Sequence, residues 1–173
     1  MKKYLNYTID LLHLMKDFQL SEVETQILSL LRQDARTSYK VIAQKTGVAI
    51  STVHNTVKRL VEKGVIKNFS LKLDSQKIGY DLTVVIGILT TQGSLQEVEQ
   101  RLVQHPNVCQ VFIVTGEYDL IVVAKFANTN ELNDFIRDFL QKTVGAARTN
   151  TSVVLSAPKE RLYPALDENL DIL

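Results

Sequence analysis

The sequence predicts an α+β protein of two domains, in which a winged-type helix-turn-helix domain is joined by a strand linker to a ferredoxin-like βαββαβ domain. Two observations support this fold class. Apolar residues recur with helical spacing over residues 23–61, whereas residues 82–155 alternate short strand-like runs with two helical segments. The charges divide at the same place, because residues 1–74 carry 12 Lys/Arg and 7 Asp/Glu, and residues 75–173 carry 8 and 12.

The composition excludes several classes of protein. The single cysteine, Cys109, permits no intrachain disulfide and no thiolate metal site, and we expect it to be a buried strand residue rather than a nucleophile. No apolar run reaches the ~18 residues that a membrane span needs. The N-terminus also lacks the pattern of a signal peptide, so we expect a cytoplasmic protein.

The net charge of +1 argues against a polyanionic partner only if the charge is evenly spread, and it is not. Between Ala35 and Lys72, eight Lys/Arg stand against one acid, Glu62. The total is a cancellation between a basic half at +5 and an acidic half at −4. Such a basic run is either a solvated face or a phosphate-binding surface, and the helical pattern beneath it favours the second.

Three helices are predicted in the basic half. Ser21 and Glu24 form an S-x-x-E capping box before the first helix, which should end near Asp34. The second helix should begin after the cap at Thr37-Ser38 and end at Gly47, where the chain turns sharply. The residues expected to face inward on the second helix are Val41 and Ile42.

The third helix carries the polar side chains of this half. Ser51 is predicted to cap it, and its buried stripe is expected to contain Val53, Val57, Leu60 and Val61. The side chains suited to phosphates or base edges, on the opposite face and its flanks, are Ser51, Thr52, His54, Asn55, Lys58 and Arg59. Lys40 and Lys63 are predicted as further DNA contacts. This arrangement is typical of a helix-turn-helix whose last helix fits a major groove.

Each polar residue type suits a particular DNA group. Arg59 can pair bidentately with guanine, Asn55 can bond adenine, and Lys58 can neutralise a phosphate. The alternative is a three-helix bundle that packs on a partner protein. After Gly64, residues 65–73 alternate apolar and polar side chains, which predicts a strand that forms a wing or a linker.

The acidic half predicts four strands and two helices in the order βαββαβ. The strands are expected at residues 82–89, 108–114, 120–126 and 148–155. The first helix should open at Ser94, with Leu95, Val98, Leu102 and Val103 inward. The second should begin near Asn130, with Leu132, Phe135, Ile136, Phe139 and Leu140 inward. Because strands 82–89 and 108–114 are apolar on both faces, we expect a second subunit to cover the sheet in an obligate dimer.

An ordered set of short motifs runs through both halves. They are Ile27-Leu28 with Leu31, Ile42-Ala43, Gly47-Val48, Ser51-Thr52-Val53, Val57-Lys58-Arg59-Leu60, Gly64-Val65-Ile66, Ile78-Gly79-Tyr80 and Gly116-Glu117-Tyr118-Asp119. Over residues 20–160 the chain resembles the leucine-responsive regulatory protein/AsnC family, the feast/famine transcription regulators of bacteria and archaea. The resemblance implies a DNA-binding domain, a hinge strand and a domain that dimerises and often assembles into tetramers or octamers. It also implies an amino-acid effector at the junction between dimers.

The family's effector turn corresponds to Gly116 and Asp119, preceded by Thr115. The further contacts that the resemblance implies, from the last helix and the final strand, are Thr129, Ser152, Val153 and Val154. Gly116 permits close approach of the backbone to a ligand, and the Asp119 carboxylate can pair with an ammonium group. The alternative is a plain turn between strands, where Gly and Asp are favoured anyway.

We expect a sequence-specific transcription regulator of a pseudo-palindromic operator, not an enzyme, with no metal and no cofactor besides an effector. His13, His54 and His105 lie in different elements without metal-ligand spacing. Siroheme decarboxylases resemble the same two-domain plan, but they carry a histidine-bearing motif in place of Gly116–Asp119. The other alternative is a metabolite-sensing assembly module without DNA binding, and the basic third helix argues against it.

The predicted boundaries are an N-terminal extension at 1–19, the helix-turn-helix domain at 20–66, a linker strand at 67–80, the βαββαβ domain at 81–157 and a tail at 158–173. The extension is predicted to be an amphipathic helix with an apolar face of Leu5, Ile9, Leu12 and Met15. We expect this helix to pack on a neighbouring subunit rather than a membrane, because its lysines do not make a strongly basic face.

Overall fold

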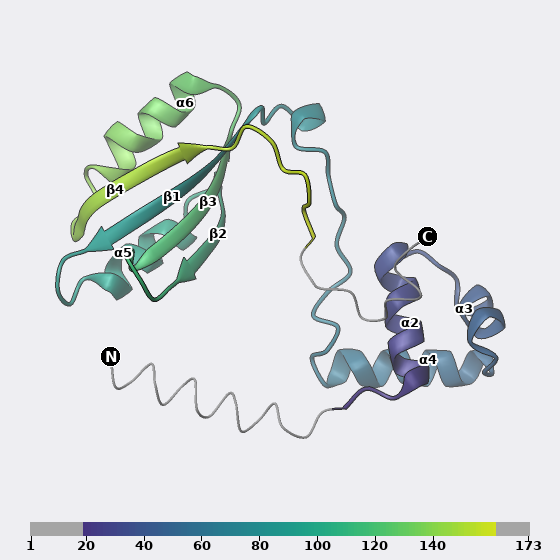
Figure 1. Ribbon diagram of the computed structural model, residues 1–173. Helices are drawn as coiled ribbons and strands as arrows, with labels where there is room; N and C mark the ends of the chain where they lie inside the picture. The colour runs from purple at the N-terminus through teal and green to yellow at the C-terminus, as the bar shows by residue number, and fades with distance from the viewer. Residues whose placement is uncertain (1–18, 162–173) are drawn as a thin grey trace. The chain divides into compact units, whose positions relative to one another are not determined.

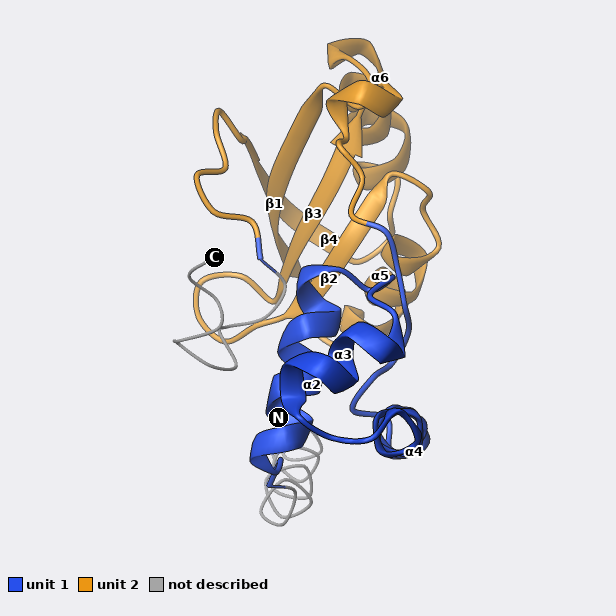
Figure 2. Cartoon of the chain, turned by 90° about the vertical axis from the view of Figure 1, so that its right-hand side faces the viewer, with its two compact units in different colours: residues 1–71, 161–173 blue, residues 72–160 orange. Residues whose placement is uncertain are grey.

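The computed structural model describes residues 19–161, which divide into two compact units (Figures 1 and 2). Among these residues, unit 1 contains 19–71 and Arg161, and unit 2 contains 72–160. The predicted N-terminal amphipathic helix and most of the predicted tail lie outside the described residues.

Unit 1 is built from α2 (Glu22–Gln33), α3 (Tyr39–Thr46) and α4 (Ile50–Glu62) (Figure 2). All three predicted helices are therefore confirmed. Their shared core consists of Ile27, Leu30, Leu31, Ile42, Ala43, Val53 and Val57. The helices pack with these apolar stripes inward, so the basic side chains of α4 remain on its outer surface.

The predicted helix caps are confirmed in α2 and α3. Both halves of the Ser21–Glu24 capping box are present, and Asp34 is the C-cap of α2. The Ser38 hydroxyl caps α3, which ends at Gly47 with a left-handed φ of 72°. These features depend only on neighbouring residues, which is why the local pattern predicted them.

The prediction for the start of α4 was wrong. Ala49, not Ser51, is the N-cap, because its carbonyl already accepts the N–H groups of Thr52 and Val53. Val41 and Val61, expected in the core, are exposed. Thr56 is buried in α4 instead, because it lies three residues after Val53 and so shares its inward face.

The predicted strand at residues 65–73 is absent from the described chain. The Val65 and Ile66 N–H groups both donate to the Leu60 carbonyl, which ends α4, and the segment then runs without ladder pairing to Leu73. Phe69, Leu71 and Leu73 are exposed. A strand needs a partner edge, and the described part of this chain supplies none here.

Unit 2 contains a four-stranded antiparallel sheet in the order β2-β3-β1-β4. Its strands are β1 (Leu82–Thr90), β2 (Val108–Ile113), β3 (Leu120–Phe126) and β4 (Ala146–Val153). Its helices are α5 (Leu95–Val103) and α6 (Thr129–Asp134), the latter continuing as the π-helical segment η3 (Phe135–Leu140), and a short 3-10 turn η2 (Gln76–Ile78) precedes β1 (Figure 1). The predicted βαββαβ order is confirmed.

One face of the sheet packs on the helices. Val84, Ile86 and Ile88 of β1 join Val98 and Leu102 of α5 in a core that also includes α6 residues. The residues that alternate with this core form the second face, which we call the open face, with Val85, Leu89, Phe112, Ile121 and Val123. Among the described residues no helix covers it, and Phe112 is about half exposed at 47%.

Several details of unit 2 differ from the sequence predictions. Val103, expected inside, is exposed at the end of α5, and Cys109, expected to be buried, is exposed. α5 opens at Ser94 as predicted, but the Ser94 hydroxyl bonds the carbonyls of Thr91 and Gly145 and makes no hydrogen bond to the N–H groups of the helix. β4 occupies residues 146–153 rather than 148–155, because the chain leaves the sheet after the Val154 N–H bonds Thr83.

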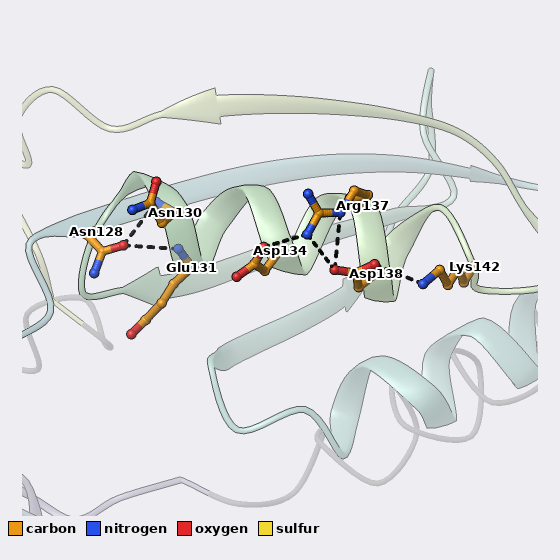
Figure 3. A network of polar contacts seen from close by, with 7 residues as sticks. All are labelled: Asn128, Asn130, Glu131, Asp134, Arg137, Asp138 and Lys142. Carbon is orange, nitrogen blue, oxygen red and sulfur yellow. Dashed lines mark hydrogen bonds and ion pairs between the residues drawn. The ribbon is translucent and has the colours of Figure 1, made fainter.

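The outer surface of α6 and η3 is a chain of polar contacts (Figure 3). The Asn128 side chain caps α6, and the Arg137 guanidinium lies 2.8 Å from Asp134 and 2.9 Å from Asp138. Lys142 lies 2.8 Å from the other Asp138 oxygen. Hydrogen bonds from Arg137 and Lys142 lower the pKa of Asp138 to about 2.

Candidate functional site

The exposed surface of α4 gathers the polar residues that the sequence singled out. These residues are Ser51, Thr52, His54, Asn55, Lys58 and Arg59, and all are exposed. They lie opposite the buried stripe and on its flanks, as the 100° rotation per residue predicts. Lys63 is the C-cap of the same helix, and Lys40 is exposed in the first turn of α3. The structure therefore places most of the predicted DNA contacts on the exposed surface of α4, and Lys40 on the preceding helix α3.

Arg59 is tied to a residue that sequence reasoning assigned only to a helix cap. Its Nη2 donates to Oε1 of Glu24 at 2.9 Å. The second Glu24 oxygen accepts both the backbone N–H and the hydroxyl of Ser21, each at 2.8 Å. The backbone N–H of Ser21 is the main group that lowers the pKa of Glu24, and Arg59 contributes to the same direction. One carboxylate therefore joins the start of α2 to the outer face of α4.

The other charged or aromatic side chains of α4 have weaker partners. Lys58 lies 3.9 Å from Glu62 one turn later, with both side chains mostly exposed. Such a surface pair is worth about 0–1 kcal/mol, so it does not prevent Lys58 from meeting a phosphate. The His54 ring packs edge-on against Tyr39 of α3, with centroids 5.9 Å apart. This contact helps to hold α4 against the preceding helix.

In unit 2 the turn between β2 and β3 is fixed to the end of β1. Oδ2 of Asp119 accepts the backbone N–H of Thr90 at 2.7 Å and its hydroxyl at 2.9 Å. The Asp119 N–H also donates to the Ile88 carbonyl at 3.0 Å. Gly116 has a φ of 124°, which favours glycine, and it is exposed. The turn therefore presents exposed backbone at Gly116 and is hydrogen-bonded to β1 through Asp119.

Tyr118, which belongs to the Gly116–Asp119 motif but was not predicted as a site residue, lies against the open face. A Cβ built on Gly87 would come within 2.8 Å of three Tyr118 ring carbons, so the ring rests directly on the glycine backbone. Its hydroxyl accepts a hydrogen bond from the Asn150 amide at 3.0 Å. Gly87 and Asn150 are register partners on β1 and β4. A glycine between buried β-branched residues was the only sequence signal for this close approach.

The predicted effector residues form two separate groups within one chain. Thr115, Gly116 and Asp119 lie where β3 begins, whereas Thr129 follows the end of β3. The other predicted residues of that second group are Ser152, Val153 and Val154. At 3.3 Å per residue the six steps along β3 separate the two ends by about 20 Å. One chain therefore does not bring all these residues together.

The described residues were also compared with the requirements of a metal site, a membrane span and a histidine site. Across residues 19–161, no group of three metal-ligating side chains could hold a metal ion. No helix in the same range has the length and apolar character to cross a membrane. His105 is partly buried against Phe135 and Phe139, with centroids 4.7 and 4.5 Å away, and this burial lowers the pKa of His105. That histidine belongs to the packing of unit 2.

A tri-helical unit with a polar, basic last helix, followed by a βαββαβ unit, defines a helix-turn-helix transcription regulator with a second, ligand-binding domain. Residues 20–67 match the model of winged helix-turn-helix DNA-binding domains, and residues 83–164 match that of the Lrp/AsnC ligand binding domain. The chain belongs to the Lrp/AsnC family of transcriptional regulators.

Sequence relatives agree with this assignment. An uncharacterized HTH-type transcriptional regulator of Pyrococcus abyssi is 43% identical over 147 residues, which are 84% of this chain and 99% of the relative. The HTH-type transcriptional regulator FL11 of Pyrococcus furiosus is 35% identical over 141 residues, which are 82% and 93% of the two chains. These relatives are regulators, so the expectation that the chain is not an enzyme is confirmed.

Solved structures share the fold. AsnC of Escherichia coli superposes with a TM-score of 0.80 at 23% identity, covering 84% of this chain and 99% of that one. A transcriptional regulator of Neisseria meningitidis, solved as its L-Met complex, also gives 0.80, at 21% identity and covering 83% and 95%. The predicted fold class is therefore confirmed.

Proposed function

We propose that this regulator binds DNA sequence-specifically through α4, forms a dimer through unit 2 and responds to an amino acid or a related small metabolite. The exposed face of α4 carries this proposal, because amide, hydroxyl and cationic side chains share one surface there. Acting on DNA would place the protein in the cytoplasm. Two copies would present two such helices to successive major grooves, about 34 Å apart, on a pseudo-palindromic operator.

The proposed roles on DNA follow from the chemistry of each group. Asn55 contacts adenine, while Ser51 and Thr52 near the start of α4 contact phosphates or bases. Lys58 contacts a phosphate. Arg59 has further donors besides the one given to Glu24, and 53% of its side chain is exposed, so it can contact DNA while the ion pair orients it. The flanking contacts in this proposal are His54, Lys40 and Lys63.

The open face supports dimerisation. Five apolar side chains on three strands leave an apolar surface without a covering helix among the described residues. Burying such a surface against its own copy is favourable, at roughly 25 cal/mol per Å² of apolar area. We extend the proposal to assembly of dimers into tetramers or octamers, as the family resemblance implies.

The proposed effector binds between chains. The two groups of predicted residues lie at opposite ends of the sheet, so a single site would combine the Thr115–Asp119 turn of one copy with Thr129 and residues 152–154 of another. The L-Met complex of the structural relative supports an amino acid as the ligand class. Such a ligand would alter DNA affinity only if it binds one assembly more tightly than another.

A gel shift on the promoter DNA of the chain's own gene tests the proposal, with a scrambled duplex of equal length as the control. We expect retention of the promoter at lower protein concentration than the scrambled DNA. The variant Asn55→Ala should reduce this preference, at a cost of about 1–3 kcal/mol for the specific site. Failure of the wild-type protein to retain either DNA would instead support a sensing module without DNA binding.

A further inference from the structure

A cleft of about 550 Å³ lies in unit 2 at the end of the sheet where β1 begins. Its walls come from residues 72–83, from Lys125 of β3 and from residues 154–160. The turn that holds Asp119 is at the other end of β1, beside Thr90. Seven residue-to-residue steps along β1 separate Thr83 from Thr90, or about 23 Å. The cleft shares Val154 with the proposed effector residues and shares none of the turn.

Lys125 places an ammonium group inside this cleft. Only 24% of its side chain is exposed, and its Nζ donates to the Ser75 hydroxyl at 2.8 Å. Among the residues that the structure describes, the carboxylate it meets is that of Glu160, at 4.0 Å. An ammonium has three donors, and a charge-assisted bond to a carboxylate is normally about 2.7–2.9 Å long. Lys125 can therefore bind the carboxylate of a ligand at a shorter distance than the 4.0 Å that separates it from Glu160.

Glu160 marks where a carboxylate would sit. Its carboxylate lies between two ammonium groups, 3.5 Å from Lys72 and 4.0 Å from Lys125. The Glu160 carbonyl accepts a further hydrogen bond from Lys72 at 3.0 Å. The Glu160 side chain is 63% exposed, so its ion pairs are weak and easily exchanged. A carboxylate from solution can compete for the same two lysines.

The acidic groups on the walls leave this position available. The Asp74 carboxylate accepts the backbone N–H groups of Gln76 and Lys77 at 3.1 and 3.3 Å, and it lies 3.8 Å from the Lys77 ammonium. Asp74 is therefore engaged in the turn before β1 rather than with Lys125. Asp81 also lines the cleft and is exposed.

We propose that this cleft binds a small carboxylate ligand, whose carboxylate replaces that of Glu160 and accepts hydrogen bonds from Lys125, Ser75 and Lys72. Glu160 acts as a built-in competitor for the ligand. The volume of the cleft suits a compound of metabolite size. The inference does not depend on DNA binding or on the effector turn, although the cleft shares Val154 with the second group of proposed effector residues.

Hydrogen–deuterium exchange of the full chain, titrated with glutarate at constant ionic strength, tests this proposal. Glutarate should slow exchange in peptides covering residues 72–83. Because Glu160→Ala removes the competitor, half-maximal protection should need about two- to fivefold less glutarate than in the wild type, which is the range of an exposed ion pair. Lys125→Met keeps the length of the side chain and removes the charge, so this protection should disappear.

The uncharged analogue glutaramide is the matched ligand control, and Ser75→Ala is a second variant if Lys125→Met does not fold. Ser75→Ala should raise the glutarate concentration needed for half-maximal protection. The proposal is overturned if glutaramide protects residues 72–83 as well as glutarate does, or if the wild type and Glu160→Ala respond identically. Protection confined to residues 114–119 would also overturn it, because the acid would then bind at the effector turn.

Discussion

Arg59 of α4 and Glu24 of α2 form an ion pair with 2.9 Å between Nη2 and Oε1, although they lie 35 positions apart in the chain. The Glu24 side chain is only 11% exposed and also completes the capping box of α2. The pair therefore couples the helix proposed to bind DNA to the start of the domain. This geometry predicts that Glu24 helps to fix the position of α4 through Arg59.

Glu24→Gln should destabilise unit 1 by about 1 kcal/mol, because glutamine can still complete the capping box but loses the charged bond to the half-exposed Arg59. Denaturant unfolding measures this change. The pKa of Glu24 is lowered in the folded state, so its contribution is present above the ordinary pKa near 4.5 and is lost as the pH falls through the folded value. The difference between the two proteins should therefore shrink in acid.

The control for that experiment is Glu22→Gln, in the same first turn of α2. Glu22 is exposed, so its substitution should change stability by less than about 0.5 kcal/mol. Equal losses in the two variants would show that the ion pair contributes nothing beyond the charge of the helix terminus.

Gly87→Ala should destabilise unit 2 by about 1–3 kcal/mol, because the new methyl group would overlap the Tyr118 ring. A double-mutant cycle of unfolding free energies with Tyr118→Ala measures the coupling. Since removal of the ring leaves space for the methyl group, Gly87→Ala should cost much less in the Tyr118→Ala background. Additive losses in the double variant would contradict the direct contact.

The Asp119 turn should be needed for a ligand response. In a thermal-shift screen of the twenty amino acids, we expect at least one to raise the melting temperature of the wild type but not of Asp119→Ala. Thr90→Val is the matched control, because it removes one hydrogen-bond partner of Asp119 and leaves the carboxylate in place. If no amino acid shifts the wild-type melting temperature, the turn has a structural role alone.

Unit 2 should lose stability between neutral and mildly acidic pH because of His105. Burial against two phenylalanines lowers the pKa of His105, and its Nδ1 accepts the Asn107 N–H at 3.2 Å. The contribution of neutral His105 to the stability of unit 2 is fully present above the pKa of histidine in the unfolded chain, near 6.5. It is lost as the pH falls from there toward the lower pKa of His105 in the folded protein. His105→Phe should reduce this pH dependence of chemical unfolding, whereas His54→Gln should retain it. The same slope in both variants would exclude His105 as the cause.

Features that depend on a few neighbouring residues could be predicted from the sequence. The Ser21–Glu24 box, the end of α3 at Gly47 and the order of the strands are of this kind. The start of α4 was misplaced because the turn before it, and not the hydroxyl of Ser51, decides which carbonyl begins the helix. The strand at 65–73 was predicted from alternation alone, which cannot supply a partner.

The sequence predicted which residues form the candidate site, but not which side chains they contact. The outer face of α4 follows from helical rotation, so its six polar residues could be selected in advance. The contacts that fix it could not, since Glu24 and Arg59 meet only after the three helices have packed. Tyr118 on Gly87 and Lys125 beside Ser75 likewise join residues far apart in the chain.

The central claim, that the face of α4 binds DNA, is tested most directly by the salt dependence of DNA affinity. Fluorescence anisotropy with promoter DNA should show log Kd rising linearly with log salt. Lys58→Ala should weaken binding to all sequences and lower the slope by about 1, because one phosphate contact is lost, while Lys142→Ala on unit 2 should leave it unchanged. Affinity independent of salt, or an identical slope for Lys58→Ala and the wild type, would contradict the account.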